Sequence, residues 1–173
     1  MVRKPPNYCP DCGSELQEKH HDGRERGYCQ NCSELFFQSP RPTAWTVVHE
    51  DEKAVFVRTS NGPWSVPGGF VEVDESAAEG AVRELEKETN LRVSSEQIEL
   101  IRTGFHMNDP DDGSLLSICF AVPRSEVTGQ MRPKNEIAEV EFCCPDLLEK
   151  RGERIRSVDE HRHEVAILKA RSL

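Results

Sequence analysis

Residues 67–91 read PGGFVEVDESAAEGAVRELEKETNL, and this stretch decides the fold. Apolar residues recur over 76–89 at the spacing of one helical face, which predicts a helix there. Ser76 followed three residues later by Glu79 has the spacing of a capping box at the start of that helix. Asn90 stands where a helix needs a left-handed residue to end, and Asn is the usual second choice after Gly.

Two acidic residues of this helix indicate a metal site. Glu84 and Glu88 are four residues apart, so their carboxylates leave the same face about one turn apart. Such close like charges are unfavourable without a cation between them, and carboxylate oxygens suit Mg²⁺ or Mn²⁺. The loop predicted over 67–69 has little side-chain bulk, so the Gly68 carbonyl can reach the same ion.

Arg83 can pair with Glu75 or with Glu84 and hold a carboxylate in position. An acidic helix by itself is more often a solvated surface than a site. Here the helix is preceded by a Pro-Gly-Gly loop and lies between predicted strands, which favours a site.

The fixed spacing Gly69-x5-Glu75-x7-Arg83-Glu84-Leu85-x2-Glu88-x2-Leu91 resembles the Nudix box, GX5EX7REUXEEXGU with U aliphatic. The resemblance implies an α/β fold, the Nudix α/β/α sandwich with a mixed sheet. It also implies metal-dependent hydrolysis of a nucleoside diphosphate linked to another group, with Glu84 and Glu88 as metal ligands. Either of these two could be the base, while Arg83 and Glu75 orient the ligands.

The box departs from the family pattern at two positions. Asn90 replaces a Gly, a mild change at a helix end. Lys87 replaces the first Glu of the EE pair, which removes a candidate metal ligand and puts an ammonium beside the site. Two hypotheses therefore stay open: a pyrophosphohydrolase, or an inactive Nudix domain that binds a nucleotide or a protein partner.

A further ligand in this family often follows the box, from a loop before a later strand. Residues 133–142 resemble that segment, and Glu136 is our candidate for the ligand, with Glu139 second. A solvated acidic turn is the alternative for either residue.

Four cysteines near the N-terminus form two CxxC pairs, Cys9 with Cys12 and Cys29 with Cys32. Each pair can place two thiolates on one ion, so the spacing predicts a structural zinc site. Two unrelated redox pairs are a weaker interpretation. We expect a zinc ribbon over 1–38 and a Nudix domain over 39–173.

A zinc ribbon before a Nudix domain resembles the NADH and ADP-ribose pyrophosphatase branch. The SQPWPFPxS motif of NADH pyrophosphatases is missing, so ADP-ribose or another nucleoside diphosphate derivative is at least as good a candidate as NADH. Phe36, Phe37 and the Pro-Arg linker lie where that branch has an aromatic-Pro segment leading to the first strand. Phe37, and Trp45 on that strand, are our candidate substrate contacts. A core position is the alternative for Trp45.

The remaining pattern predicts strands and helices outside the box. Strands are expected over 43–48, 54–57, 98–105, 115–122 and 139–142, and helices over 145–150 and 158–170. Cys119, Cys143 and Cys144 fall in apolar stretches and are predicted to be buried.

The composition narrows the partners and the compartment. The net charge of −9 disfavours binding to nucleic acid, because its field repels phosphate. No apolar run is long enough for a membrane span, and the N-terminus lacks a signal-peptide pattern, so we expect a cytoplasmic protein. The family resemblance also favours a homodimer.

Overall fold

The computed structural model describes residues 6–107 and 114–156. The chain divides into two compact units, residues 1–41 with 105–115, and residues 42–104 with 116–173. Among the described residues, no helix is long and apolar enough to cross a membrane.

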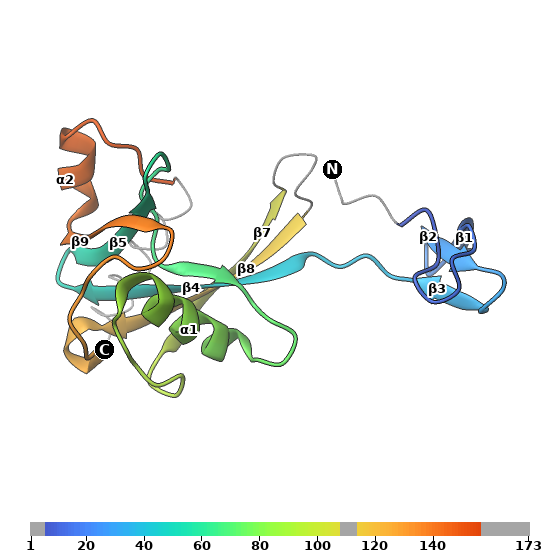
Figure 1. The fold of residues 1–173 in the computed structure, drawn as a ribbon, viewed down its shortest axis with the longest axis horizontal. Coiled ribbons are helices and arrows are strands. Elements are labelled where there is room, and N and C mark those ends of the chain that lie inside the picture. Colours follow the sequence, from blue (N-terminus) through green and yellow to red (C-terminus); the bar gives the residue numbers. More distant parts are fainter. Residues whose placement is uncertain (1–5, 108–113, 157–173) are drawn as a thin grey trace. The chain divides into compact units, whose positions relative to one another are not determined.

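The first unit contains a small antiparallel sheet in the order β1-β2-β3 (Figure 1). Its strands are β1 (Gln17–His21), β2 (Arg24–Cys29) and β3 (Glu34–Phe36). Among its described residues, the buried hydrophobic side chains are those of Cys9 and Cys29. So small an apolar core needs another source of stability, and the predicted zinc ion would supply it.

The second unit is built on a six-stranded sheet in the order β7-β8-β4-β5-β9, with β6 also paired to β4. The elements are β4 (Arg41–Glu50), β5 (Lys53–Thr59), β6 (Gly68–Phe70), α1 (Ala77–Thr89), β7 (Glu99–Met107), β8 (Ser114–Pro123), a short 3-10 helix η1 (Arg124–Glu126), β9 (Ile137–Cys143) and α2 (Pro145–Lys150). Strands β4 and β5 form a hairpin, and β5 pairs antiparallel with β9.

The sheet has an apolar core on each face, because side chains alternate along a strand. On β4, Ala44 and Val48 belong to the core that also contains Leu85 of α1. Trp45 and Val47 of the same strand belong to the other core, together with Leu148 of α2. Helices therefore cover both faces, and the predicted α/β/α sandwich is confirmed.

Most predicted elements are present, with shifted boundaries. The helix at 145–150 has the predicted bounds. The segment 67–69 was predicted to be a loop, but Gly68–Phe70 forms β6, because its backbone pairs with β4. The helix predicted over 158–170 lies outside the described residues.

The cysteine predictions are correct at two positions and wrong at one. Cys119 and Cys143 are buried in the core, as expected. Cys144 is only half-buried, because it is the N-terminal cap residue of α2, where the chain leaves the sheet.

Candidate functional site

Both predicted ends of α1 are confirmed. The Ser76 hydroxyl accepts a hydrogen bond from the Glu79 N–H at 3.2 Å, and the Glu79 carboxylate accepts one from the Ser76 N–H at 2.7 Å. Asn90 has φ 62°, in the left-handed region, and its N–H donates to the Glu86 carbonyl. The capped helix gives the acidic residues between these ends a fixed direction.

Glu84 lies buried at the centre of the site, with 6% of its side chain exposed. Its Oε1 accepts a hydrogen bond from Arg83 Nη1, and its Oε2 accepts one from Lys87 Nζ at 2.9 Å. The Lys87 ammonium has a raised pKa, mainly because of this bond. Both oxygens of Glu84 are therefore paired with cations of the chain itself.

Glu88 is buried beside Glu84, but its surroundings differ. Its Oε2 accepts a hydrogen bond from the Gly68 N–H at 3.1 Å. Burial raises the pKa of this carboxyl group to about 7. Gly68 is opposite Trp45 in the β4–β6 pair, yet its N–H points to Glu88. In antiparallel strands the N–H and C=O of one residue point to the same side, so the Gly68 carbonyl faces that side too.

Arg83 pairs with both Glu75 and Glu84, the two alternative partners proposed from the sequence. Its Nε and Nη2 donate to the two oxygens of Glu75 at 2.9 and 2.6 Å, and Nη2 also donates to the Phe70 carbonyl. Glu75 also accepts from the Glu72 N–H at 2.8 Å. The bond to Arg83 is the main reason that the pKa of Glu75 is lowered to about 2. Arg83 thus links Glu75 to Glu84.

The loop that carries Glu136 is held against the C-terminal turn of α1. Arg132 N–H donates to the Thr89 carbonyl at 2.9 Å, and Lys134 N–H to the Glu88 carbonyl at 3.1 Å. The Asn135 side chain donates to the Lys87 carbonyl at 2.7 Å.

These bonds use helix carbonyls that have no partner within the helix. They place Glu136 Oε1 3.5 Å from Lys87 Nζ. Asn135 was not predicted from the sequence as a residue of the site; its φ of 54° is typical of a turn Asn.

Glu139, the second choice for the late ligand, is bound elsewhere. Arg58 on β5 donates to Glu139 Oε1 from Nε at 3.1 Å and from Nη2 at 2.6 Å. Arg58 also pairs with Glu153 at 3.1 Å. The Glu139 carboxylate is therefore paired with a neighbouring strand of the sheet. Of the two candidates, Glu136 is the one that lies beside α1.

The two predicted substrate contacts lie in different surroundings. Trp45 is 9% exposed and packs in the core, as the alternative interpretation expects. Its indole N–H donates to the Thr43 hydroxyl at 3.0 Å. Burial leaves little of the ring for a nucleotide base, so this structure does not support its assignment as a contact. Phe37 belongs to the first unit, is exposed, and lies under the Arg26 guanidinium at 4.4 Å.

The four cysteines fit a tetrahedral metal site. All four sulfur atoms lie within 4.8 Å of one another. The Cys9–Cys32 and Cys12–Cys29 sulfur distances are 3.9 and 3.5 Å. Zinc–sulfur bonds of about 2.3 Å in a tetrahedron put sulfurs roughly 3.8 Å apart. The donor set and its spacing both suit zinc.

The carboxylates fit a hard divalent ion by their chemistry. Glu84 and Glu88 supply oxygen donors on adjacent turns, beside the Gly68 carbonyl. They are less converged than the cysteines, which form the one close group of ligand atoms found in the described part of the chain.

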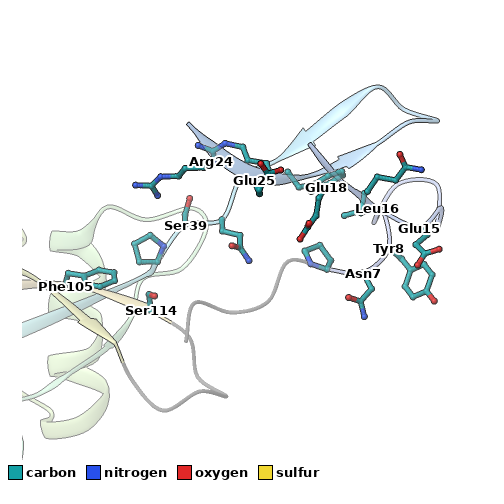
Figure 2. Close-up of a pocket in the computed structure, with 17 residues that line it drawn as sticks. Asn7, Tyr8, Glu15, Leu16, Glu18, Arg24, Glu25, Ser39, Phe105 and Ser114 are labelled. Carbon is teal, nitrogen blue, oxygen red and sulfur yellow. The ribbon is translucent and has the colours of Figure 1, made fainter. Parts of the chain in front are cut away.

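A hollow of about 470 Å³ lies in the first unit (Figure 2). Its lining mixes the acidic Glu18 and Glu25 with Arg24, and none of the predicted metal or substrate residues lines it. We assign it no role.

A NUDIX domain matches residues 39–162, which is most of the chain. The chain belongs to the Nudix family. The capped helix and the Gly68–Phe70 strand of this Nudix domain carry the family's sequence box.

Curated Nudix relatives match part of the chain. A MutT-like protein of Streptomyces ambofaciens is 31% identical over 109 residues, 62% of this chain and 66% of the relative. An NAD-capped RNA hydrolase NudC of Photorhabdus laumondii is 30% identical, covering 50% of this chain and 34% of the relative. An ADP-ribose pyrophosphatase of Methanocaldococcus jannaschii is 28% identical, covering 56% and 57%. This chain thus spans between about a third and two thirds of the length of these relatives.

Solved structures confirm the Nudix fold. A NUDIX hydrolase from Nitrosomonas europaea has a TM-score of 0.66 at 20% identity, over 90% of this chain and 87% of that one. The NUDIX domain of Shewanella oneidensis NrtR, solved with ADP ribose, has a TM-score of 0.62 at 20% identity, over 83% and 94%.

Proposed function

We propose that this Nudix domain hydrolyses the diphosphate bond of a nucleoside diphosphate linked to another group, using Mg²⁺ or Mn²⁺. The observation that carries the proposal is the pair of buried carboxylates, Glu84 and Glu88, on adjacent turns of α1 beside β6. Arg83 and Lys87 compensate the charge of Glu84. Glu88 is buried with no ion pair among the described residues, which is costly for a carboxylate unless a bound cation compensates it.

The metal ligands would be Glu84, Glu88 and the Gly68 carbonyl, with Glu136 from the later loop. A divalent ion bound there would activate water and neutralise phosphate oxygens. Arg83, held by both oxygens of Glu75, fixes the direction of the Glu84 carboxylate. A misdirected ligand would weaken binding of the ion.

Glu88 is the better candidate for the base. Both oxygens of Glu84 accept hydrogen bonds from cations, so neither is open to an attacking water. Glu88 accepts one bond from Gly68, and its other oxygen has no hydrogen-bond partner among the described residues. That oxygen can accept the proton of an attacking water, while Oε2 keeps a second lone pair for a metal ion.

The substrate class is proposed from relatives and from the sequence. Relatives of this chain include an ADP-ribose pyrophosphatase and NAD-capped RNA hydrolases. The SQPWPFPxS motif is absent, which weakens the case for NADH. We therefore place ADP-ribose first among the substrates to test.

A second candidate function is nucleotide binding without turnover. Lys87 favours this function, because its ammonium forms ion pairs with both Glu84 and Glu136, two of the proposed metal ligands. Binding of ADP-ribose with no hydrolysis in Mg²⁺ or Mn²⁺ would support this second function.

The test is a panel of ADP-ribose, NADH and NAD⁺ with each metal, followed by product analysis. We expect hydrolysis by the wild-type protein and its loss in Glu88→Gln, with the fold unchanged. Glu86→Gln is the matched control, because Glu86 lies on the same helix but pairs with Arg92 at 2.7 Å. Full activity of Glu88→Gln would contradict the role assigned to Glu88. No hydrolysis of any substrate by the wild type would contradict the proposal that this domain is a hydrolase.

We also propose that the four cysteines hold a structural zinc ion, since a closed set of four thiolates leaves no position for substrate. A homodimer remains a prediction, to be checked by light scattering of the purified protein. Weak binding to nucleic acid also remains a prediction, for a titration at several salt concentrations.

A further inference from the structure

We propose that the Lys87 ammonium takes the place of one divalent cation in this site, so that the domain binds one fewer metal ion than its carboxylates could hold. This inference rests on the proposed function, because it supposes that Glu84 and Glu88 bind a divalent metal.

The position of the ammonium carries the argument. Lys87 Nζ lies 2.9 Å from Glu84 Oε2 and 3.5 Å from Glu136 Oε1. It therefore lies between the carboxylate of the helix and the carboxylate of the later loop, two of the oxygen donors that we propose for a divalent ion. An ammonium is a compact point charge with three donors, so it can serve two carboxylates at once.

The pairing differs from an ordinary surface ion pair along a helix. Such pairs are exposed at both ends and contribute little to stability. Here the Glu84 side chain is only 6% exposed, and its second oxygen is bound by Arg83. A buried carboxylate needs compensating charge. Lys87 is part of that compensation.

The second carboxylate is brought to Lys87 by fixed backbone contacts. Asn135 bonds the Lys87 carbonyl, and the Lys134 N–H bonds the Glu88 carbonyl. Glu136 follows directly in the chain, so its distance from Lys87 is set by the loop and not by side-chain flexibility alone.

A divalent ion that used both Glu84 and Glu136 would have to displace this ammonium. The positive charge would remain nearby and repel the ion, which lowers its affinity. An ion held mainly by Glu88 and the Gly68 carbonyl avoids that contact. The structure therefore favours metal binding on the Glu88 side.

Two substitutions separate charge from size. Lys87→Met removes the ammonium and keeps a side chain that suits a helix, while Lys87→Glu adds a carboxylate in its place. Lys134→Met is the matched control, because Lys134 lies in the adjacent loop but has no ion pair among the described residues.

The experiment is a titration of the full chain with Mn²⁺, counting bound ions by electron paramagnetic resonance. We expect Lys87→Glu to bind one more Mn²⁺ per chain than the wild type. We expect Lys87→Met to gain a further site or to bind Mn²⁺ at least about tenfold more tightly. Lys134→Met should match the wild type, and tryptophan fluorescence of each variant checks its fold.

The outcomes separate this inference from the proposed function. Equal numbers and equal affinities in the wild type and both Lys87 variants would overturn the role of Lys87 and leave the proposed function standing. The same holds if Lys134→Met changes binding as much as Lys87→Met. No Mn²⁺ bound by any of the proteins would overturn the proposed function, and this inference with it.

Discussion

Gly69 lies directly against the side chain of Glu84. A Cβ atom added at Gly69 would lie 2.8 Å from the Glu84 carboxyl carbon and 3.0 Å from its Oε1. Glu84 is buried, and both of its oxygens are engaged, so it has little room to move away. The glycine that opens the sequence box is therefore needed for space beside the carboxylate.

We expect Gly69→Ala to displace the Glu84 carboxylate. The new methyl group would push the side chain off its bonds with Arg83 and Lys87, so kcat should fall about ten- to a hundredfold. Gly62→Ala is the control, because its Cβ would meet the hydroxyl of Thr59, the last residue of β5, which is not a residue of the site. Steady-state kinetics on the identified substrate measures both. Equal losses in the two variants would contradict the specific role of Gly69.

Glu136 and Glu139 are predicted to behave differently when neutralised. Glu136→Gln removes a carboxylate that faces Lys87, so we expect a change in Mn²⁺ affinity and in turnover. Glu139→Gln removes a partner of Arg58 and should cost about 1 kcal/mol of stability or less without changing metal binding. Parallel Mn²⁺ titration and thermal unfolding compare the two. A larger change in metal affinity for Glu139→Gln would reverse our choice of ligand.

Loss of one cysteine of the cluster should release zinc. We expect Cys29→Ser to lose the ion and to unfold the β1–β3 module, because that module has few other buried apolar residues. Cys144→Ser is the control, since Cys144 lies outside the cluster. Elemental analysis measures zinc content. A full equivalent of zinc in Cys29→Ser would contradict the assignment.

The ion pair of Glu75 with Arg83 should make stability depend on pH in the acid range. The pKa of Glu75 in the folded protein is about 2, below the ordinary value of 4.5. A lowered folded pKa contributes stability that is present above pH 4.5 and is lost as the pH falls towards 2.

We therefore expect Glu75→Gln to be less stable than the wild type at neutral pH, by about 1 to 3 kcal/mol. The difference should shrink between pH 4.5 and 2. Both tryptophans, Trp45 and Trp64, lie in the second unit, so their fluorescence during urea unfolding reports on this domain even if zinc is lost in acid. A difference that stays constant across this range would contradict the explanation.

Local spacing was enough to predict several features of the site. The capping box of Ser76 and Glu79, the left-handed Asn90 and the shared face of Glu84 and Glu88 involve residues at most four positions apart. At that separation the geometry of the helix alone decides which groups meet. The four cysteines were also predictable, because two CxxC turns and one tetrahedral ion impose their own geometry.

Contacts between segments far apart in the sequence could not be predicted from local spacing. Arg58 is 81 residues from Glu139, and their pairing depends on the register of β5 against β9. That register pairs Glu139 with Arg58, so the structure favours Glu136 as the later ligand. The burial of Trp45 likewise depends on which face of β4 turns towards α2.

The sequence by itself thus determined the family, the helix of the box and the cysteine cluster, since each depends on fixed short spacing. Only the tertiary structure decided that Gly68–Phe70 is a strand, and that Lys87 lies between Glu84 and Glu136. The reason is that strand pairing and loop docking join residues whose separation along the chain carries no geometric information. Lys87 appears in the sequence as a departure from a motif, and folding turns it into a cation shared by two carboxylates.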